Sequence, residues 1–228
     1  ADATQPSENT LQVQVVLTGV PKNMQEALTP ILPLVAYTHY QGNSVSRMKI
    51  LYARSQVALQ EALKPYGYYH TVVTAHLIEL QPHRWKAVFQ ITLNQPIRIQ
   101  STDIQITGTK DPVILTLTEH PPLQPGAILN QMDYEAYKSN LLNTAVEEGY
   151  LDAAFTTHAL RIDRQHNTAI VVLILKAGPQ YRFGQVFFHQ DKPLFSEAFL
   201  HRFVRFQPDS PYRYTEVQAL QNNLNQSQ

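Results

Sequence analysis

Histidine is the residue type in this sequence that most invites a catalytic or metal-binding interpretation, because an imidazole can ligate a metal ion or transfer a proton near neutral pH. The nine histidines are spread along the chain, with no HExxH motif and no pair at ligand spacing. A metal or catalytic centre needs several groups that converge on one point. We therefore interpret the histidines as half-exposed polar positions and expect no metal site.

The other motifs that signal catalysis or cofactor binding are also missing from the sequence. The chain has no cysteine, which excludes disulfides, thiolate zinc sites and cysteine nucleophiles. Its eight glycines form neither a GxGxxG nor a GxxxxGK[ST] motif, and no serine lies in a GxSxG motif. Asp152, the one carboxylate that suggests a catalytic acid, is placed in a loop between a helix and a strand. We expect neither an enzyme nor a bound cofactor.

The charge balance narrows the possible partners. Lys+Arg and Asp+Glu both number 18, so the formal net charge is zero. A general nucleic-acid-binding surface requires an excess of Lys and Arg, so nucleic acid is not expected as a partner. No apolar run approaches the roughly 18 residues of a membrane helix. At roughly 150 residues per domain, the 228 residues suggest one or two domains.

An internal repeat is the most informative feature of the sequence. The dipeptide Gly-Tyr occurs at positions 67–68 and again at 149–150, a separation of 82 residues. Residues at the spacing of one helix face precede both copies, at the same offsets. They are Tyr52, Leu59 and Leu63 in the first copy, and Tyr134, Leu141 and Ala145 in the second.

Each Gly-Tyr is placed directly after a helix. A glycine just past the last helical residue fits a left-handed C-terminal cap, and the tyrosine after it can fold back onto the core. We therefore predict structural roles for Gly67, Tyr68, Gly149 and Tyr150.

Strands flank the helices in the same order in both copies. Period-two alternation and short turns predict a first strand, two helices and a closing pair of strands in each unit. The predicted strands are 11–17, 71–80 and 85–93 in the first unit, and 104–108, 155–162 and 168–175 in the second. The first helix, at about 23–34, contains Pro30 and Pro33 and is expected to be short or broken. Its counterpart lies at about 112–119.

A third unit begins at Tyr181, where the pattern of the second unit recurs. Its first strand and two helices are predicted, but the position of the next Gly-Tyr falls near residue 232, so the closing hairpin is missing. The predicted organisation is a disordered tail at 1–9, complete units at 10–95 and 96–178, and a truncated unit at 179–228.

The tandem of strand-helix-helix-strand-strand units resembles polypeptide-transport-associated (POTRA) domains, which form the periplasmic arm of the outer-membrane assembly-factor superfamily. The closer match looks like the TamA-like branch, the outer-membrane subunit of the translocation and assembly module. Three stretches carry the resemblance: residues 61–69, residues 129–138 continuing to 147–152, and residues 181–186. The third unit departs from the family pattern, because residues 189–191 (His-Gln-Asp) replace the usual glycine turn.

The resemblance implies both a fold and a function. The fold is α+β, with tandem β-α-α-β-β units, each a three-stranded mixed sheet covered on one face by two helices. The function is to bind and dock outer-membrane proteins or autotransporters in an unfolded state during their insertion or translocation. An inner-membrane-anchored TamB-like protein is the implied partner. The location is the periplasm, with membrane contact only through a C-terminal barrel beyond this sequence.

Three other functions remain open. The chain can be the arm of a barrel-assembly-machine subunit, the arm of a two-partner-secretion translocator, or a purely structural spacer. The number of units before the barrel distinguishes the three kinds of transport arm, and three units favour the TamA-like branch.

The expected binding site is a sheet edge in each unit. If the apolar third strand is central, the second strand is an edge whose unpaired N–H and C=O groups can template an incoming strand. These strands hold Thr, His and small residues rather than dense charge, so they are weakly protected. The predicted partner-binding residues are Thr71, Val73, Ala75 and Leu77 in the first unit, and Phe155, Thr157, Ala159 and Arg161 in the second.

Overall fold

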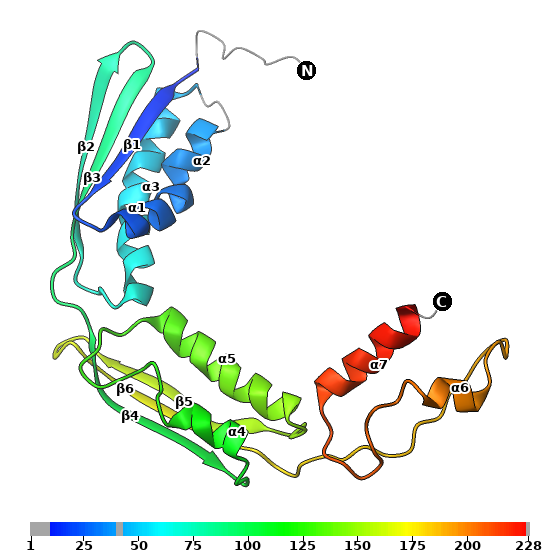
Figure 1. Ribbon diagram of the computed structural model, residues 1–228. Helices are drawn as coiled ribbons and strands as arrows, with labels where there is room; N and C mark the ends of the chain where they lie inside the picture. The colour runs from blue at the N-terminus through cyan, green and yellow to red at the C-terminus, as the bar shows by residue number, and fades with distance from the viewer. Residues whose placement is uncertain (1–9, 40–42, 227–228) are drawn as a thin grey trace. The chain divides into compact units, whose positions relative to one another are not determined.

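The computed structural model describes residues 10–39 and 43–226, so the predicted disordered tail at 1–9 lies outside the described residues. The fold is α+β, as expected, with two three-stranded sheets whose helices lie on one face (Figure 1). Contacts divide the chain into two compact units. Of the described residues, the first comprises those up to 100 together with 125–132 and 162–169, and the second comprises 101–124, 133–161 and those from 170 onward.

The first sheet has its third strand in the centre. Its strands are β1 (Gln12–Thr18), β2 (Val72–Gln81) and β3 (Arg84–Thr92), in the order β1-β3-β2. β1 runs parallel to β3 and β2 runs antiparallel to it. The sheet is therefore mixed, and the period-two pattern predicted all three strands to within about two residues.

Prolines break the helical segment that follows β1, as the sequence predicts. α1 (Lys22–Leu28) passes into a 3-10 turn at 29–31 that contains Pro30, and α2 (Pro33–His39) begins at the second proline. The long α3 (Val45–Leu63) follows, and the hydroxyl oxygen of Ser44 accepts a hydrogen bond from the Arg47 amide at its start.

The core of the first unit lies between the sheet and these helices. Leu59 and Leu63, which the helical spacing singled out, are fully buried, and Tyr52 packs its ring 5.5 Å from that of Phe89 on β3. Alternate residues of β3 contribute Ala87, Phe89 and Ile91. Apolar burial at this alternation fixes which face of the sheet the helices cover.

The second sheet repeats this order. Its strands are β4 (Arg98–Thr107), β5 (Ala154–Asp163) and β6 (Thr168–Lys176), in the order β4-β6-β5. α4 (Pro112–Leu115), a 3-10 turn at 116–118 and α5 (Gln131–Glu147) accompany them. The predicted strand at 104–108 was too short at its start, because residues 100–103 (Gln-Ser-Thr-Asp) are polar and hide the alternation.

The segment after residue 178 contains two helices, α6 (Glu197–His201) and α7 (Tyr214–Gln226). The predicted first strand of a third unit is wrong for the described residues 179–226, where an isolated bridge between Arg182 and Pro211 is the only β pairing. The reason is physical: β1 is a strand because it pairs with β3, and these residues include no such central strand. Phe183 instead stacks on Phe206, with ring centroids 3.9 Å apart.

The buried side chain of Ser55 hydrogen-bonds α2 to α3, and its replacement tests how much these bonds stabilise the first unit. The Ser55 hydroxyl accepts a hydrogen bond from the Leu34 amide (3.1 Å) and donates one to the Leu51 carbonyl (2.8 Å). The Leu34 amide belongs to the first turn of α2, where no carbonyl within the helix can pair with it.

We predict that Ser55→Ala lowers the free energy of unfolding of the first unit by about 1–3 kcal/mol, because it leaves the Leu34 amide buried without a partner. The measurement is urea unfolding followed by the fluorescence of Trp85 on β3, the single tryptophan of the chain. Val57→Ala, at a side chain that is 58% exposed, is the control and should change the midpoint little. Equal midpoints for the two variants would contradict the prediction.

Candidate functional site

Each sheet exposes two edge strands. β3 and β6 are central, so β1 and β2 are the edges of the first sheet and β4 and β5 are those of the second. The expectation that the second strand of each unit is an edge is confirmed by this order. An edge strand offers main-chain donors and acceptors to an added strand unless something covers them.

The side chains predicted to bind partners do not line the solvent face of the sheets. Thr71 precedes β2, and the side chains of Val73, Ala75 and Leu77 pack on the helix-covered face. On β5, Phe155, Thr157 and Ala159 occupy the equivalent half-buried positions, whereas Arg161 is exposed. These residues lie on or beside the edge strands, but only their main-chain groups are placed to meet an added strand.

The alternate residues of β2 form an exposed apolar row that the sequence analysis did not select. Val72 is 54% exposed, Ile78 48% and Leu80 56%. They belong to the face of the sheet that carries no helix. Alternation alone could have found them, since the residues between two core-facing positions must point to the opposite face.

Two features protect β2. The side-chain amide of Gln56 on α3 donates to the Val73 carbonyl (2.6 Å), so a main-chain acceptor of β2 is already bonded. The pairing register shifts between Glu79 and Gln81, which marks a bulge at the end of the strand. Bulges and covering groups are the usual means by which an edge strand avoids unwanted pairing.

The beginning of β4 is covered by a segment of the chain itself. The Ile99 amide donates to the Ala127 carbonyl (2.9 Å), and the Gly126 amide donates to the Ile99 carbonyl (2.7 Å). The Leu129 amide donates to the Ile97 carbonyl (2.8 Å). This part of the edge therefore has its pairing groups occupied.

The glycine of the first Gly-Tyr is the point at which the next strand of the chain attaches. Gly67 ends the long helical segment in a left-handed conformation (φ +93°), which confirms the predicted cap. Its carbonyl accepts a hydrogen bond from the Ile97 amide (2.7 Å). A β-carbon on Gly67 would lie 2.4 Å from the Leu129 carbonyl oxygen, a distance that no packing allows.

The second Gly-Tyr repeats this arrangement. Gly149 has φ +94° after α5, and its carbonyl accepts from the Tyr181 amide (2.8 Å). A β-carbon there would lie 2.5 Å from the Tyr212 carbonyl oxygen. Tyr150 is buried, and its hydroxyl lies 2.6 Å from the hydroxyl oxygen of Thr109. We call these two arrangements the Gly-Tyr joints.

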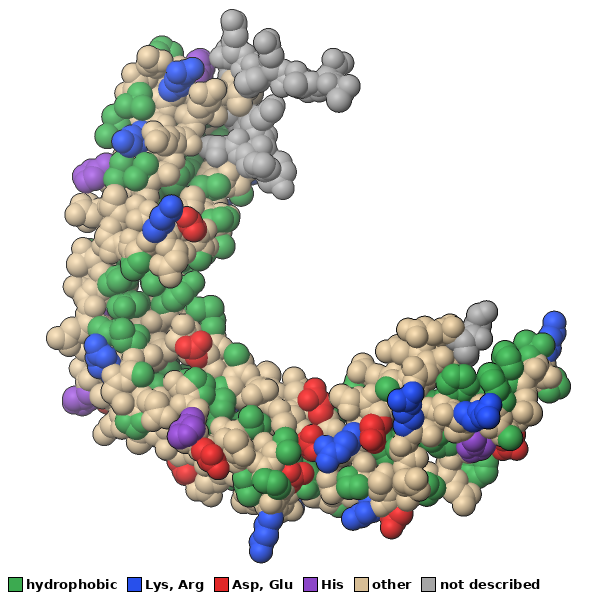
Figure 2. Space-filling view, viewed as in Figure 1, with side chains coloured by type: hydrophobic (Ala, Val, Ile, Leu, Met, Phe, Trp, Pro, Cys, Tyr) green, Lys and Arg blue, Asp and Glu red, His purple; other side chains and the backbone are tan. Residues whose placement is uncertain are grey.

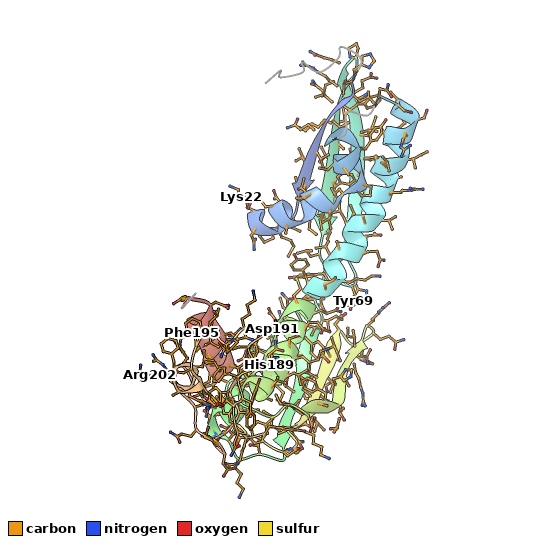
Figure 3. All side chains as sticks on the ribbon, turned by 90° about the vertical axis from the view of Figure 1, so that its right-hand side faces the viewer. Lys22, Tyr69, His189, Asp191, Phe195 and Arg202 are labelled. Atoms are coloured by element: carbon orange, nitrogen blue, oxygen red, sulfur yellow. The ribbon has the colours of Figure 1, made fainter. Side chains whose placement is uncertain are left out.

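Polar contacts surround the first joint. Tyr69 lies at the end of α3 (Figure 3), and the Gln131 side-chain amide donates to its hydroxyl at 2.5 Å. The Arg164 guanidinium lies 5.0 Å from the centre of the Tyr69 ring, a cation–π contact. His70 Nε2 lies 2.9 Å from the Arg164 carbonyl oxygen. All of these residues belong to the first compact unit.

The second joint is held by charged groups. The Tyr181 hydroxyl donates to the Asp152 carboxylate (2.8 Å), and this hydrogen bond raises the pKa of Tyr181. Arg213 forms an ion pair with Glu148, whose side chain is 16% exposed. The loop carboxylate Asp152 therefore has a structural contact here, in keeping with its placement between a helix and a strand.

Titratable groups elsewhere make local contacts. The hydrogen bond from His166 lowers the pKa of Asp163, the last residue of β5. Burial raises the pKa of Tyr137 to about 12, and its hydroxyl donates to the Leu117 carbonyl (2.8 Å). Within the described residues, no three His, Asp or Glu side chains gather where a metal ion could be held. Basic and acidic side chains are intermixed on the face shown in Figure 2.

No helix among the residues that the structure describes is long and apolar enough to cross a bilayer.

Comparison with known proteins finds a family match over the first repeat. Residues 14–93 match the family model described as POTRA domain TamA domain 1. Similar solved structures include POTRA domains 3–5 of BamA from Haemophilus influenzae, at 13% identity over 96% of this chain and 85% of that one, with a TM-score of 0.46. POTRA domains 1–3 of the periplasmic domain of Omp85 from Anabaena match at 18% identity over 95% and 84%, with a TM-score of 0.33.

We predict that Gly149→Ala disrupts the second joint. The left-handed backbone alone costs about 1–2 kcal/mol for a residue with a β-carbon, and the crowding against the Tyr212 carbonyl adds to it. Amide hydrogen exchange at Tyr181 should accelerate, because its acceptor is the Gly149 carbonyl. Gly126→Ala is the control, since Gly126 has φ +87° but nothing within 4 Å of its β-carbon position. Equal exchange at Tyr181 in the two variants would contradict a joint that depends on close approach.

Proposed function

Because residues 14–93 match the family model described as POTRA domain TamA domain 1, we propose that this protein is a non-catalytic periplasmic arm of an outer-membrane protein assembly or translocation factor. The observation that carries the proposal is the family match on a repeat that recurs in the second sheet with the same strand order. The arm binds and docks other proteins, and its attachment to the outer membrane lies in a barrel beyond this sequence.

The proposed mechanism is strand addition at a sheet edge. Main-chain pairing is largely independent of sequence, which suits a protein whose unfolded outer-membrane or autotransporter clients differ. The edges of β2 and β5 supply the main-chain groups. A TamB-like protein anchored in the inner membrane is the second proposed partner, and we assign it no surface.

A spacer role for the first unit is the alternative with a specific observation in its favour. Gln56 occupies an acceptor of β2, and the Gly-Tyr joints fix the ends of the long helices by close main-chain contact. A unit of this kind transmits position without binding a client. Arms of a barrel-assembly-machine subunit or of a two-partner-secretion translocator would use the same edges with other partners.

We predict that an unfolded outer-membrane client peptide slows amide hydrogen exchange within residues 71–80, 154–162 or both, because an added strand pairs with edge main-chain groups. The measurement is hydrogen exchange on the full chain with and without the peptide, with the helix α7 as an internal reference that should not change. Unchanged exchange in both ranges would refute strand addition and favour the spacer.

A further inference from the structure

Two arginines line one groove between the last two helices of the chain. Arg202 directly follows α6, and Arg205 lies three residues further along in the turn that leads away from that helix. Asn223 and Gln226 of α7, together with the ring of Phe203, complete the lining of a cavity of about 290 Å³. All five residues belong to the second compact unit. We call this cavity the arginine groove.

The two guanidinium groups of the arginine groove have no partner of opposite charge. Elsewhere in the same segment, Arg182 donates to a main-chain carbonyl, and Arg213 forms an ion pair with Glu148. Among the residues that the structure describes, Arg202 and Arg205 form no ion pair, and no carboxylate lines the groove. Both side chains are exposed. Like charges on one surface repel each other, so an anion bound here would relieve the repulsion.

The second repeat has a corresponding groove, which shows what kind of surface this is. That groove lies between the 3-10 turn after α4 and the helix α5, and its lining includes Leu117, His120, Tyr137 and Asn140. Asn223 is 83 residues after Asn140, the spacing that relates α7 to α5. The groove of the second repeat is open although its sheet has all three strands. The arginine groove is therefore a surface between helices, separate from the place that a central strand would take.

The two grooves differ in charge. The groove of the second repeat contains the carboxylate of Asp133 and the imidazole of His120. The arginine groove contains two guanidinium groups instead. A guanidinium presents its N–H donors in a planar fork that matches the two oxygens of a carboxylate or of a phosphate. The chemistry of the lining thus selects an anionic oxygen group.

The neighbouring side chains favour a peptide as the source of this anion. The side-chain amides of Asn223 and Gln226 each offer donors and an acceptor, as a peptide main chain does, whereas a phosphate group offers acceptors. The Phe203 ring meets Phe199 edge-on at 5.4 Å, and Phe199 stacks on Phe195 at 5.3 Å. Phe195 is 39% exposed (Figure 3). An aromatic wall therefore runs from the groove to the surface, where an apolar side chain of a peptide can pack.

The charge of the segment argues against a lipid surface as the ligand. Residues 179–228 contain five Lys and Arg and four Asp and Glu, a net charge of +1. Attraction to an anionic membrane usually requires a cluster of about four to eight basic residues. The positive charge here is confined to one groove.

We propose that the arginine groove binds an acidic segment of a partner protein. A carboxylate of the partner pairs with Arg202 and Arg205, and an adjacent aromatic or aliphatic side chain packs against Phe203. Clusters of arginine are a common means of recognising acidic motifs. This site lies on helices and goes beyond the proposed function, because it does not depend on strand addition at a sheet edge.

The probe is a fluorescent, terminally blocked peptide of sequence Gly-Glu-Phe-Glu-Gly, and its uncharged counterpart has Gln in place of Glu. Binding to the full chain is measured by fluorescence anisotropy. We expect the glutamate peptide to bind about tenfold more tightly than the glutamine peptide, because only a carboxylate forms charge-assisted hydrogen bonds with the guanidinium groups. Its affinity should fall as salt rises from about 0.05 M to about 0.5 M, since the groove is exposed and its charges are screened.

Substitutions in the groove test the assignment. Arg202→Gln and Arg205→Gln should each weaken binding of the glutamate peptide by about three- to tenfold. Asn223→Asp should also weaken it, because this variant introduces a carboxylate, as Asp133 does in the second repeat. Arg54→Gln, which removes an exposed arginine of α3, is the matched control and should have no effect.

A charge reversal distinguishes a lost contact from a damaged fold. The double variant Arg202→Glu, Arg205→Glu should lose the glutamate peptide and bind the corresponding lysine peptide, Gly-Lys-Phe-Lys-Gly, which the unmodified chain should not bind. A misfolded variant would gain no such binding. A double variant that binds neither peptide, although its circular dichroism spectrum matches that of the unmodified chain, would overturn the proposal.

Other outcomes would also overturn it. Equal binding of the glutamate and glutamine peptides excludes recognition of a carboxylate, and an equal loss in Arg54→Gln and the groove variants excludes this site. Binding of inorganic phosphate or of phosphatidylglycerol vesicles that depends on the two arginines, without binding of the glutamate peptide, assigns the groove to a phosphate group instead. Strand addition is measured separately, by hydrogen exchange in residues 71–80 and 154–162, so its failure and the failure of this inference are distinguishable.

Discussion

The hydrogen bond to the carbonyl of a left-handed glycine, donated by the amide of the segment that begins the next repeat, is the contact on which the repeat depends. At Gly67 the donor is Ile97, and at Gly149 it is Tyr181. In both places a second carbonyl approaches so closely that no β-carbon fits. The glycine thus ends a helix and accepts a hydrogen bond from the segment that starts the next repeat, and one residue type meets both requirements because it has no side chain.

The last strand of each repeat is the central strand of its sheet, so the other two strands are edges. The proposed binding function is assigned to these edges. β3 and β6 are covered on both sides by pairing, so every remaining strand has one unpaired side. The main-chain groups of these edges have different partners. Residues 126–129 hydrogen-bond to the start of β4, and the Gln56 side chain hydrogen-bonds to a carbonyl of β2. Beside β5, the open face of the central strand β6 carries the half-buried aliphatic residues Ile170, Val172 and Ile174. Protection and polarity together, more than strand order, distinguish the edges.

Local patterns predicted most of the fold, and long-range contacts account for what they missed. Helical spacing identified Leu59 and Leu63 as core residues, and the prolines predicted the broken first helix. The strand expected after Tyr181 did not form, because a strand exists only with a partner. Of the candidate site, the sequence predicted which strands are edges. It could not predict the Gln56 bond to Val73, since the two residues meet only when α3 packs on the sheet.

The joints have a consequence for protein engineering. Segments 125–132 and 162–169 belong to the same compact unit as the first sheet, although they are part of the second repeat in the chain. A chimera cut at the proline-containing connection near residue 96 would therefore separate Gly67 from the Leu129 carbonyl that fits it. A chimera that transfers the first repeat should therefore also transfer residues 125–132 and 162–169. Keeping these segments together preserves the contact between Gly67 and the Leu129 carbonyl.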